Sequence, residues 1–411
     1  SFVINADAKV NVEFKELEYV FNLYHSENKG VPSDNMTGIY RESVDETNLI
    51  DLSNKFIIGY FGEATVSTMT TNDSSRFDSW YIADYPEGEL TEFPTATKVS
   101  ATTSTVSGAT FEILNGTGSA SVTDTRRNFI LIANYIAVYQ VFTESYYRHN
   151  SAFTSGNQYV TVGGDELGFV SITNTATVGD NKYDVNTIID ISSKDTIDVN
   201  RNQLWTWYFK QEGTTQAKLL ATYSYDADSG IGTFTIVDSF KTGEFENVNY
   251  QVTITGNVIS LTFTLNSNTS GMYYAIYKEY FNVTISTHDL TDAPEGTGNY
   301  GSITATINTG YNTSLNESTY SVTGSTNISG STDATISRWV EHNAVMTFTQ
   351  LAETSRNYVF KYFNVSYQED NIEFSSIQSI LISSDITVQA NFIQKFAIFF
   401  DAYPENSGII N

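Results

Sequence analysis

Short alternations of apolar and polar residues recur along the whole chain and predict β-strands. Residues 7–14 (DAKVNVEF) alternate strictly, and residues 54–62 (NKFIIGYFG) and 78–85 (DSWYIADY) are short aromatic runs with polar borders. A period of two residues is typical of a strand with one buried face. The pattern therefore predicts an all-β protein.

One stretch near the N-terminus departs from this period. In residues 14–25 (FKELEYVFNLYH), the apolar positions Leu17, Val20, Phe21 and Tyr24 are spaced i, i+3, i+4 and i+7. This spacing places them on one face of a helix. It predicts a short helix packed on the core.

The most apolar run is residues 128–142 (NFILIANYIAVYQVF), which Asn134 interrupts. A membrane-spanning helix needs about 20 apolar residues, so this run is too short to span a bilayer. We interpret it as a buried strand pair or a core helix. Residues 1–14 show no basic and apolar leader, which favours a protein released by lysis over a secreted one.

Residues 201–286 give the clearest series of strands. Gly256-Asn257 separates two alternating runs by two residues and predicts a tight hairpin. Successive hairpins predict an antiparallel β-meander that forms a sandwich or a barrel. Trp205 and Trp207, two residues apart in one strand, are expected to lie in the core together.

Changes in composition divide the chain into segments. Residues 91–125 are rich in Thr and Ser and predict an edge hairpin or a long loop, acting as a projecting or intersubunit element. The acidic, turn-rich stretch THDLTDAPEGTGNY predicts a linker. The predicted division is a β-rich domain at 1–200, a meander at 201–286, a linker at 287–300, a module at 301–394, and a further strand or tail at 395–411.

Composition narrows the class of protein. The 411 residues are 40% hydrophobic and 14% aromatic, enough for several packed cores. A formal net charge of −26 argues against nucleic-acid binding and favours solubility. The absence of cysteine excludes disulfides, thiolate metal sites and cysteine nucleophiles. This composition suits a virion protein or a bacterial surface protein.

The sequence offers little catalytic chemistry. It contains no phosphate-binding loop, dinucleotide fingerprint, paired-histidine zinc motif or nucleophile elbow, and its four histidines (His25, His149, His288 and His342) are scattered. We therefore expect no enzyme activity and no histidine-based site.

A calcium site is the one cofactor that the sequence suggests. Asp226 and Asp228, followed by Gly230, begin like a Ca²⁺ loop, but the distal Glu of an EF-hand is missing. An ordinary Asp/Gly hairpin turn explains the same residues.

Two further stretches could contact ligands or partners. Asp165 and Glu166, or the acidic residues of 367–371, could in principle hydrolyse a glycan if they were paired across a sugar. Tyr146, Tyr147, Arg148 and His149 form a polar and aromatic group that we expect to be a contact surface.

The C-terminal region carries a family resemblance. The stretch VMTFTQLAETSRNYVFKYFNVS and the closing strand SSDITVQANF resemble the divergent internalin B-repeat of bacterial surface proteins. Tyr358 and Phe360 match its Tyr-x-Phe, Phe363 stands where the family has Trp, and residues 387–392 match its closing Thr-Val-x-Ala-Asn-Phe. The turn LAETSRN lacks the Pro and Gly usual in the family. The resemblance implies an Ig-like or β-grasp module without catalysis.

Together these features predict an all-β, multidomain protein of antiparallel sandwich or barrel units with a C-terminal Ig-like or β-grasp module. We expect a structural protein on the exterior of a tailed-bacteriophage virion, such as a head fibre, decoration or tail-associated component. Its expected partners are copies of itself, as a trimer, other virion proteins and a host surface glycan. The alternatives are a bacterial surface adhesin or glycan-binding protein, a polysaccharide depolymerase, and a double-jelly-roll capsid protein.

Overall fold

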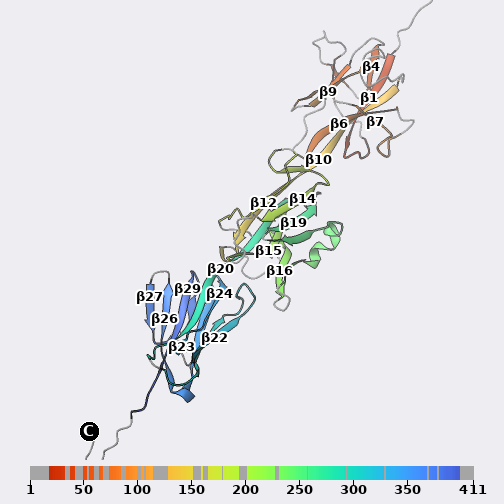
Figure 1. The fold of residues 1–411 in the computed structure, drawn as a ribbon. Coiled ribbons are helices and arrows are strands. Elements are labelled where there is room, and N and C mark those ends of the chain that lie inside the picture. Colours follow the sequence, from red (N-terminus) through yellow and green to blue (C-terminus); the bar gives the residue numbers. More distant parts are fainter. Residues whose placement is uncertain are drawn as a thin grey trace, which may run out of the picture. The chain divides into compact units, whose positions relative to one another are not determined.

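The computed structural model confirms that the protein is built almost entirely of β-strands (Figure 1). It describes residues 18–32, 38–41, 50–52, 55–59, 64–67, 74–84, 89–99, 103–105, 108–113, 128–150, 159–160, 165–177, 179–193, 201–226, 231–256, 258–292, 294–327, 330–367, 370–376 and 379–398. Within these ranges the only helical elements are 3₁₀ turns, Arg148–Asn150 (η1), Asp238–Phe240 (η3), Gly243–Phe245 (η4) and Thr354–Arg356 (η5). None of the described helices is long and apolar enough to cross a membrane.

Contacts along the chain divide it into two compact units. Unit 1 contains residues 1–140, 176–187 and 265–267, and unit 2 contains residues 141–175, 188–264 and 268–411. These boundaries differ from the domain limits expected from composition, which stay predictions.

Unit 1 holds two sheets. The first has the order β4-β1-β10-β6-β7, with β13 also pairing β10, and the second has the order β3-β2-β5-β9-β8. The strands are β1 (Glu18–Glu27), β2 (Gly38–Arg41), β3 (Ile50–Leu52), β4 (Lys55–Gly59), β5 (Ala64–Ser67), β6 (Ser75–Asp84), β7 (Thr97–Val99), β8 (Thr103–Thr105), β9 (Gly108–Ile113), β10 (Asn128–Tyr147) and β13 (Lys182–Asp184).

The central strand of unit 1, β10, is the apolar run recognised in the sequence. Four successive residues, Ile130 to Ala133, are completely buried, so both faces of the strand are covered. The buried-strand interpretation is confirmed, although the run is one continuous strand, and the core-helix alternative is wrong. Asn134 fits within it because its Oδ1 accepts a hydrogen bond from the backbone nitrogen of Lys29 at 2.8 Å.

The helix expected at residues 14–25 is wrong for its described part, because residues 18–27 form strand β1. This strand pairs in parallel with β10 and antiparallel with β4. Two ladders of backbone hydrogen bonds outweigh a helical spacing of apolar residues, since propensity is weak beside tertiary context. In the Thr/Ser-rich segment the edge-hairpin alternative is found, since β8 pairs β9 at one edge of a sheet. A projecting role for that segment stays a prediction.

The first part of unit 2 is a sandwich of two sheets. One joins β10 to β20, β15, β16 and β11, with β17 pairing β16, and the other has the order β12-β14-β19-β18. The strands are β11 (Tyr159–Val160), β12 (Val170–Ile172), β14 (Ile188–Ser193), β15 (Asn202–Gln211), β16 (Ala217–Asp226), β17 (Ile231–Ile236), β18 (Gln251–Thr255), β19 (Val258–Thr264) and β20 (Gly271–Asp289). Phe263 of β19 stacks on Tyr273 of β20 with ring centroids 4.5 Å apart, which packs the two sheets together.

The predicted hairpin is confirmed, because Thr255 of β18 pairs with Val258 of β19 across a two-residue connection. Gly256 has φ of 59°, the left-handed conformation that such a turn requires. The strands of 201–286 do not form one continuous meander, however. β18 and β19 join the second sheet, and β20 returns to the first sheet between β15 and β10.

The C-terminal part of unit 2 is a second sandwich. One sheet has the order β24-β20-β29-β26-β27 and the other β23-β22-β21-β25-β28. The remaining strands are β21 (Gly298–Ile307), β22 (Thr319–Asn327), β23 (Gly330–Thr332), β24 (Thr335–Glu341), β25 (Val345–Ala352), β26 (Tyr358–Tyr367), β27 (Asp370–Phe374), β28 (Ile380–Leu381) and β29 (Ile386–Gln394).

The core of this second sandwich draws residues from both sheets. Val283 and Val388 come from one sheet, and Ile303 and Phe348 from the other. Two facing sheets match the Ig-like alternative for this module. Glycine allows a close approach between the sheets: a Cβ added at Gly301 of β21 would lie 2.5 Å from the ring of Phe392 of β29.

Among the described strands, each of these three regions contains one parallel strand pair. β1 pairs in parallel with the first part of β10, the last part of β10 pairs in parallel with the first part of β20, and the last part of β20 pairs in parallel with β29. The segments that these strands enclose along the chain contain all the other described strands. Strands β10 and β20 therefore each take part in two successive parallel pairs.

Candidate functional site

Within the described part of unit 2, a group of ionisable side chains lies where β20 changes partners. Up to Glu279 the strand pairs with β15, and from Tyr280 onward it pairs with β24. The 3₁₀ turn η1, which directly follows β10, and the turn after β24 reach the same point. Three segments far apart in sequence meet there.

A buried ion cluster lies at this point. The side chain of Glu341 is 3% exposed, and its two oxygens lie 2.6 Å from Arg148 Nη1 and 3.2 Å from Lys278 Nζ. Both cations also lie over the ring of Trp205, at 4.6 Å and 5.5 Å from its centroid. Burial lowers the pKa of Lys278, and Glu341 opposes that shift.

Beside it lies a group of two imidazoles and one carboxylate. His342 Nδ1 is 3.0 Å and His149 Nε2 is 3.7 Å from Glu279 Oε2. The two imidazole rings are 4.1 Å apart between centroids. Burial, together with the neighbouring His342, lowers the pKa of His149 to about 4, so this imidazole is neutral at neutral pH.

Among the described residues, this is the one group of three or more side chains that could hold a metal ion. Neutral imidazoles and a carboxylate are ligands for divalent first-row metals. We call His149, Glu279 and His342 the two-histidine cluster.

The structure places the four residues of the predicted contact surface at the edge of this region. Tyr146 is 7% exposed and donates a hydrogen bond to Glu144 at 2.6 Å. The hydroxyl of Tyr147 donates to Asn202, and its ring stacks on His149. Arg148 and His149 belong to the two clusters just described. Whether these residues contact a partner stays a prediction.

The calcium candidate is described only in part. The backbone of Asp226 ends strand β16, whereas Asp228 lies outside the described residues, so the Ca²⁺ site stays a prediction. In the acidic turn, Glu166 Oε1 accepts a hydrogen bond from the backbone nitrogen of Gly168 at 2.6 Å, and from Ser145 at 3.3 Å. The structure thus assigns this carboxylate a role in anchoring its own loop.

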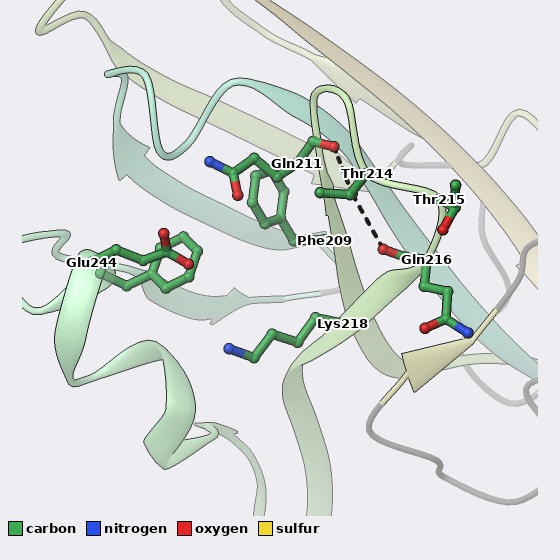
Figure 2. A pocket seen from close by; sticks show the side chains of 8 residues that line it. Phe209, Gln211, Thr214, Thr215, Gln216, Lys218 and Glu244 are labelled. Carbon is green, nitrogen blue, oxygen red and sulfur yellow. Dashed lines mark hydrogen bonds between the residues drawn. The ribbon is translucent and has the colours of Figure 1, made fainter.

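A separate hollow of about 280 Å³ lies beside the sandwich of unit 2 (Figure 2). Lys218 lines this hollow, and its ammonium lies 4.9 Å from the ring centroid of Phe240 and 5.4 Å from that of Phe245. On one wall, Thr214 Oγ1 donates to the backbone oxygen of Gln211 at 2.7 Å. The ammonium of Lys218 is therefore already held over aromatic rings.

Sequence reasoning missed most of the residues of these clusters. Scattered histidines indicated no histidine-based site, but folding brings His149 and His342 together. One local signal was available, because Lys278-Glu279 interrupts the aromatic strand MYYAIYKEYF, and adjacent charges in a buried strand need partners. The expectation that Trp205 shares the core with Trp207 is wrong. A register shift between Leu204 and Thr206 turns Trp205 toward the cations.

The residues that carry the internalin-repeat resemblance lie on adjacent strands. Phe360 of β26 pairs with Phe392 of β29, and their rings are 5.9 Å apart. Phe363, at the position of the family's Trp, is 1% exposed. These contacts give the residues a shared place in the core, and membership of that family stays a prediction.

No family model matches the chain. No curated protein matches it either. Among solved structures, it is similar to the major pilin of Streptococcus pyogenes (11% identity over 94% of this chain and 100% of that one, TM-score 0.18). It is also similar to the major pilin SpaD of Corynebacterium diphtheriae (8%, 94% and 100%, 0.21) and to BcpA, the major pilin subunit of Bacillus cereus (9%, 91% and 99%, 0.24). TM-scores this low carry no inference about function.

Proposed function

We propose that the chain is a non-catalytic structural protein of a bacterial exterior surface that carries tension along a series of β-modules. The observation behind this proposal is the set of three parallel pairs, β1–β10, β10–β20 and β20–β29. In each pair the earlier strand leads toward the N-terminus and the later strand leads toward the C-terminus.

Parallel pairing decides how these pairs respond to a pull on the two ends of the chain. The earlier strand is drawn backward along its axis and the later one forward, so the ladder is loaded in shear. All its evenly spaced hydrogen bonds then share the load and must break together. In an antiparallel hairpin pulled at its open end, the bonds break one after another.

The same three parallel pairs keep most of the chain free of tension. Roughly 100 residues lie between β1 and β10, roughly 120 between β10 and β20, and roughly 100 between β20 and β29. Each of these segments would span on the order of 300–450 Å if it were fully extended. While the parallel pairs hold, these segments bear no tension. This property suits a protein that links a surface to something that moves relative to it.

The location at a bacterial surface is supported by the internalin-repeat resemblance of residues 345–392 and by the acidic, cysteine-free composition. The virion location shares the composition but has no structural observation in its favour. Self-association, including the trimer expected from the sequence, is a further part of the proposal, since sheet edges such as β8 and β18 could pair with other copies.

Single-molecule force spectroscopy tests the tension-bearing role. Because the chain has no cysteine, paired Cys substitutions give unique attachment points. With handles at the two ends, we expect unfolding forces several-fold higher than with handles at Gln251→Cys and Thr262→Cys, the pair at the open end of a hairpin. Those two residues face each other in the antiparallel hairpin β18–β19, which would unzip. Equal forces in the two geometries would contradict the proposal.

A second experiment tests the location. Antibody labelling and protease shaving of intact producing cells should detect the chain at the cell surface, and its mass in solution should reveal any trimer. Recovery of the chain in purified phage particles, with none on cells, would replace the cell-surface proposal with the virion alternative.

A further inference from the structure

We propose that His149, Glu279 and His342 form a binding site for one divalent transition-metal ion, preferably Zn²⁺. This proposal is independent of the tension-bearing role. It is based on the spacing, chemical type and surroundings of the three side chains.

The spacing fits a metal centre. The three ligand atoms all lie within 4.8 Å of one another, and two of the separations are 3.0 Å and 3.7 Å. Tetrahedral zinc has bonds of about 2.0–2.1 Å to nitrogen and oxygen, which places neighbouring ligand atoms about 3.3 Å apart. The two separations lie on either side of this value, so small side-chain movements suffice.

The ligand types select the class of metal. Imidazole nitrogens suit zinc, cobalt, nickel and copper, whereas Ca²⁺ and Mg²⁺ prefer shells made of oxygen. Three protein ligands leave one position of a tetrahedron for water or for a group from a partner. The side chains are 17–21% exposed, which leaves solvent a route to that position.

The surroundings hold the ligands in place. Tyr147 stacks on His149 with ring planes 14° apart, and the ring of Phe281 meets His342 edge-on at 5.4 Å. The backbone nitrogen of His342 donates to the backbone oxygen of Glu279 at 2.8 Å, which ties two of the ligands together. Orientation of this kind by neighbouring groups is a regular feature of metal sites.

A metal ion here would join three segments at the point where β20 changes partners. His149 lies in η1 just after β10, Glu279 lies within β20, and His342 follows β24. The ion would bind the folded state in preference to the unfolded chain and would thereby raise its stability. The competing explanation is an ordinary hydrogen bond between His342 and Glu279.

Metal content after equilibrium dialysis distinguishes the two explanations. The untagged, EDTA-stripped chain is dialysed against Zn²⁺, and bound zinc is measured by mass spectrometry. We expect one zinc per chain, at least tenfold weaker binding in His149→Gln and in His342→Gln, and unchanged binding in His288→Gln. His288 is a matched control, because it forms a pair with Asp333 at 2.7 Å on an exposed surface. Ca²⁺ in place of Zn²⁺ should leave the cluster empty.

A measurement on the unaltered chain removes any doubt about misfolded variants. Its four histidines give four Hε1 signals in a ¹H–¹³C spectrum. Zn²⁺ should shift or broaden two of them and leave the other two in place, and Co²⁺ should produce the visible absorption of a four-coordinate site. Absence of binding at 100 µM Zn²⁺, or undiminished binding in the double variant of His149 and His342, would overturn the proposal.

Discussion

Two buried carboxylates lie at opposite ends of the C-terminal half of β20, and their charges are neutralised differently. At its start, Glu341 of the neighbouring strand β24 faces two cations, Arg148 and Lys278. At its end, Asp289 of β20 itself accepts hydrogen bonds from uncharged donors. These are the hydroxyls of Tyr358 at 2.9 Å and Ser331 at 2.6 Å, and the backbone nitrogen of Thr291 at 2.9 Å.

The two carboxylates have different structural roles. The donors to Asp289 all belong to the second sandwich, so its hydrogen bonds organise one module internally. Arg148 follows β10 in the preceding sandwich, so the ion cluster ties that sandwich to β24. Removing a partner from a buried ion cluster leaves uncompensated charge, whereas removing one neutral donor leaves the carboxylate with others.

The largest effect is expected from Glu341→Gln. It leaves two largely buried cations, Arg148 and Lys278, without their carboxylate and should lower the free energy of unfolding by about 3–5 kcal/mol, as expected for a broken buried pair. Urea denaturation measures the loss. Glu317→Gln is the control, because Glu317 pairs with Arg338 at the surface and should cost about 0–1 kcal/mol. Similar losses in the two variants would contradict the special weight given to the buried ion cluster of Glu341.

A smaller loss is expected from Tyr358→Phe at the other end. It removes one hydrogen bond to the carboxylate of Asp289, worth about 1.5–3 kcal/mol for a charged acceptor. Thermal unfolding measures the change, with Tyr362→Phe on the same strand as control because its hydroxyl is not bonded to Asp289. If Tyr358→Phe cost more than Glu341→Gln, the neutral network would be the stronger of the two.

Ser331→Ala should cost less again, about 0.5–1.5 kcal/mol, which is the usual net value of a hydrogen bond. Ser331 is exposed, so water can replace its hydroxyl at Asp289. A double-mutant cycle with Tyr358→Phe measures how far the two donors compensate for each other. A coupling energy near zero would mean that they act independently.

The smallest expected effect concerns stability in alkaline solution, where the contributions of Tyr358 and Lys278 change with pH in opposite directions. Burial raises the pKa of Tyr358 to about 12 from its ordinary 10, so its contribution to stability is lost as pH rises from 10 to 12. The pKa of Lys278 is lowered from its ordinary 10.5 by burial, so just below pH 10.5 the unfolded chain binds more protons than the folded chain. The contribution of Lys278 to stability therefore becomes more favourable as pH rises. Tyr358→Phe should therefore weaken the alkaline loss of stability and Lys278→Met should steepen it. Urea titrations at pH 9–11 measure both slopes, and equal slopes in the two variants would contradict the assignment.

Local patterns predicted the fold class and several elements correctly. The alternations in residues 201–286 and the Gly256 turn correspond to observed strands and to a hairpin. The helix at residues 14–25 failed because β10 offers β1 a ladder that no local pattern reveals. The two-histidine cluster was beyond reach for the same reason, since its ligands lie more than 60 residues apart.

By itself the sequence determined an all-β chain, acidic and without cysteine. These properties follow from composition and from periods of two residues, which act between neighbours in the chain. Only the tertiary structure decided that β10 and β20 each serve two parallel pairs, and that His149, Glu279 and His342 meet. Parallel pairing and side-chain clusters join distant segments, and their energy comes from contacts that exist only once the chain has folded.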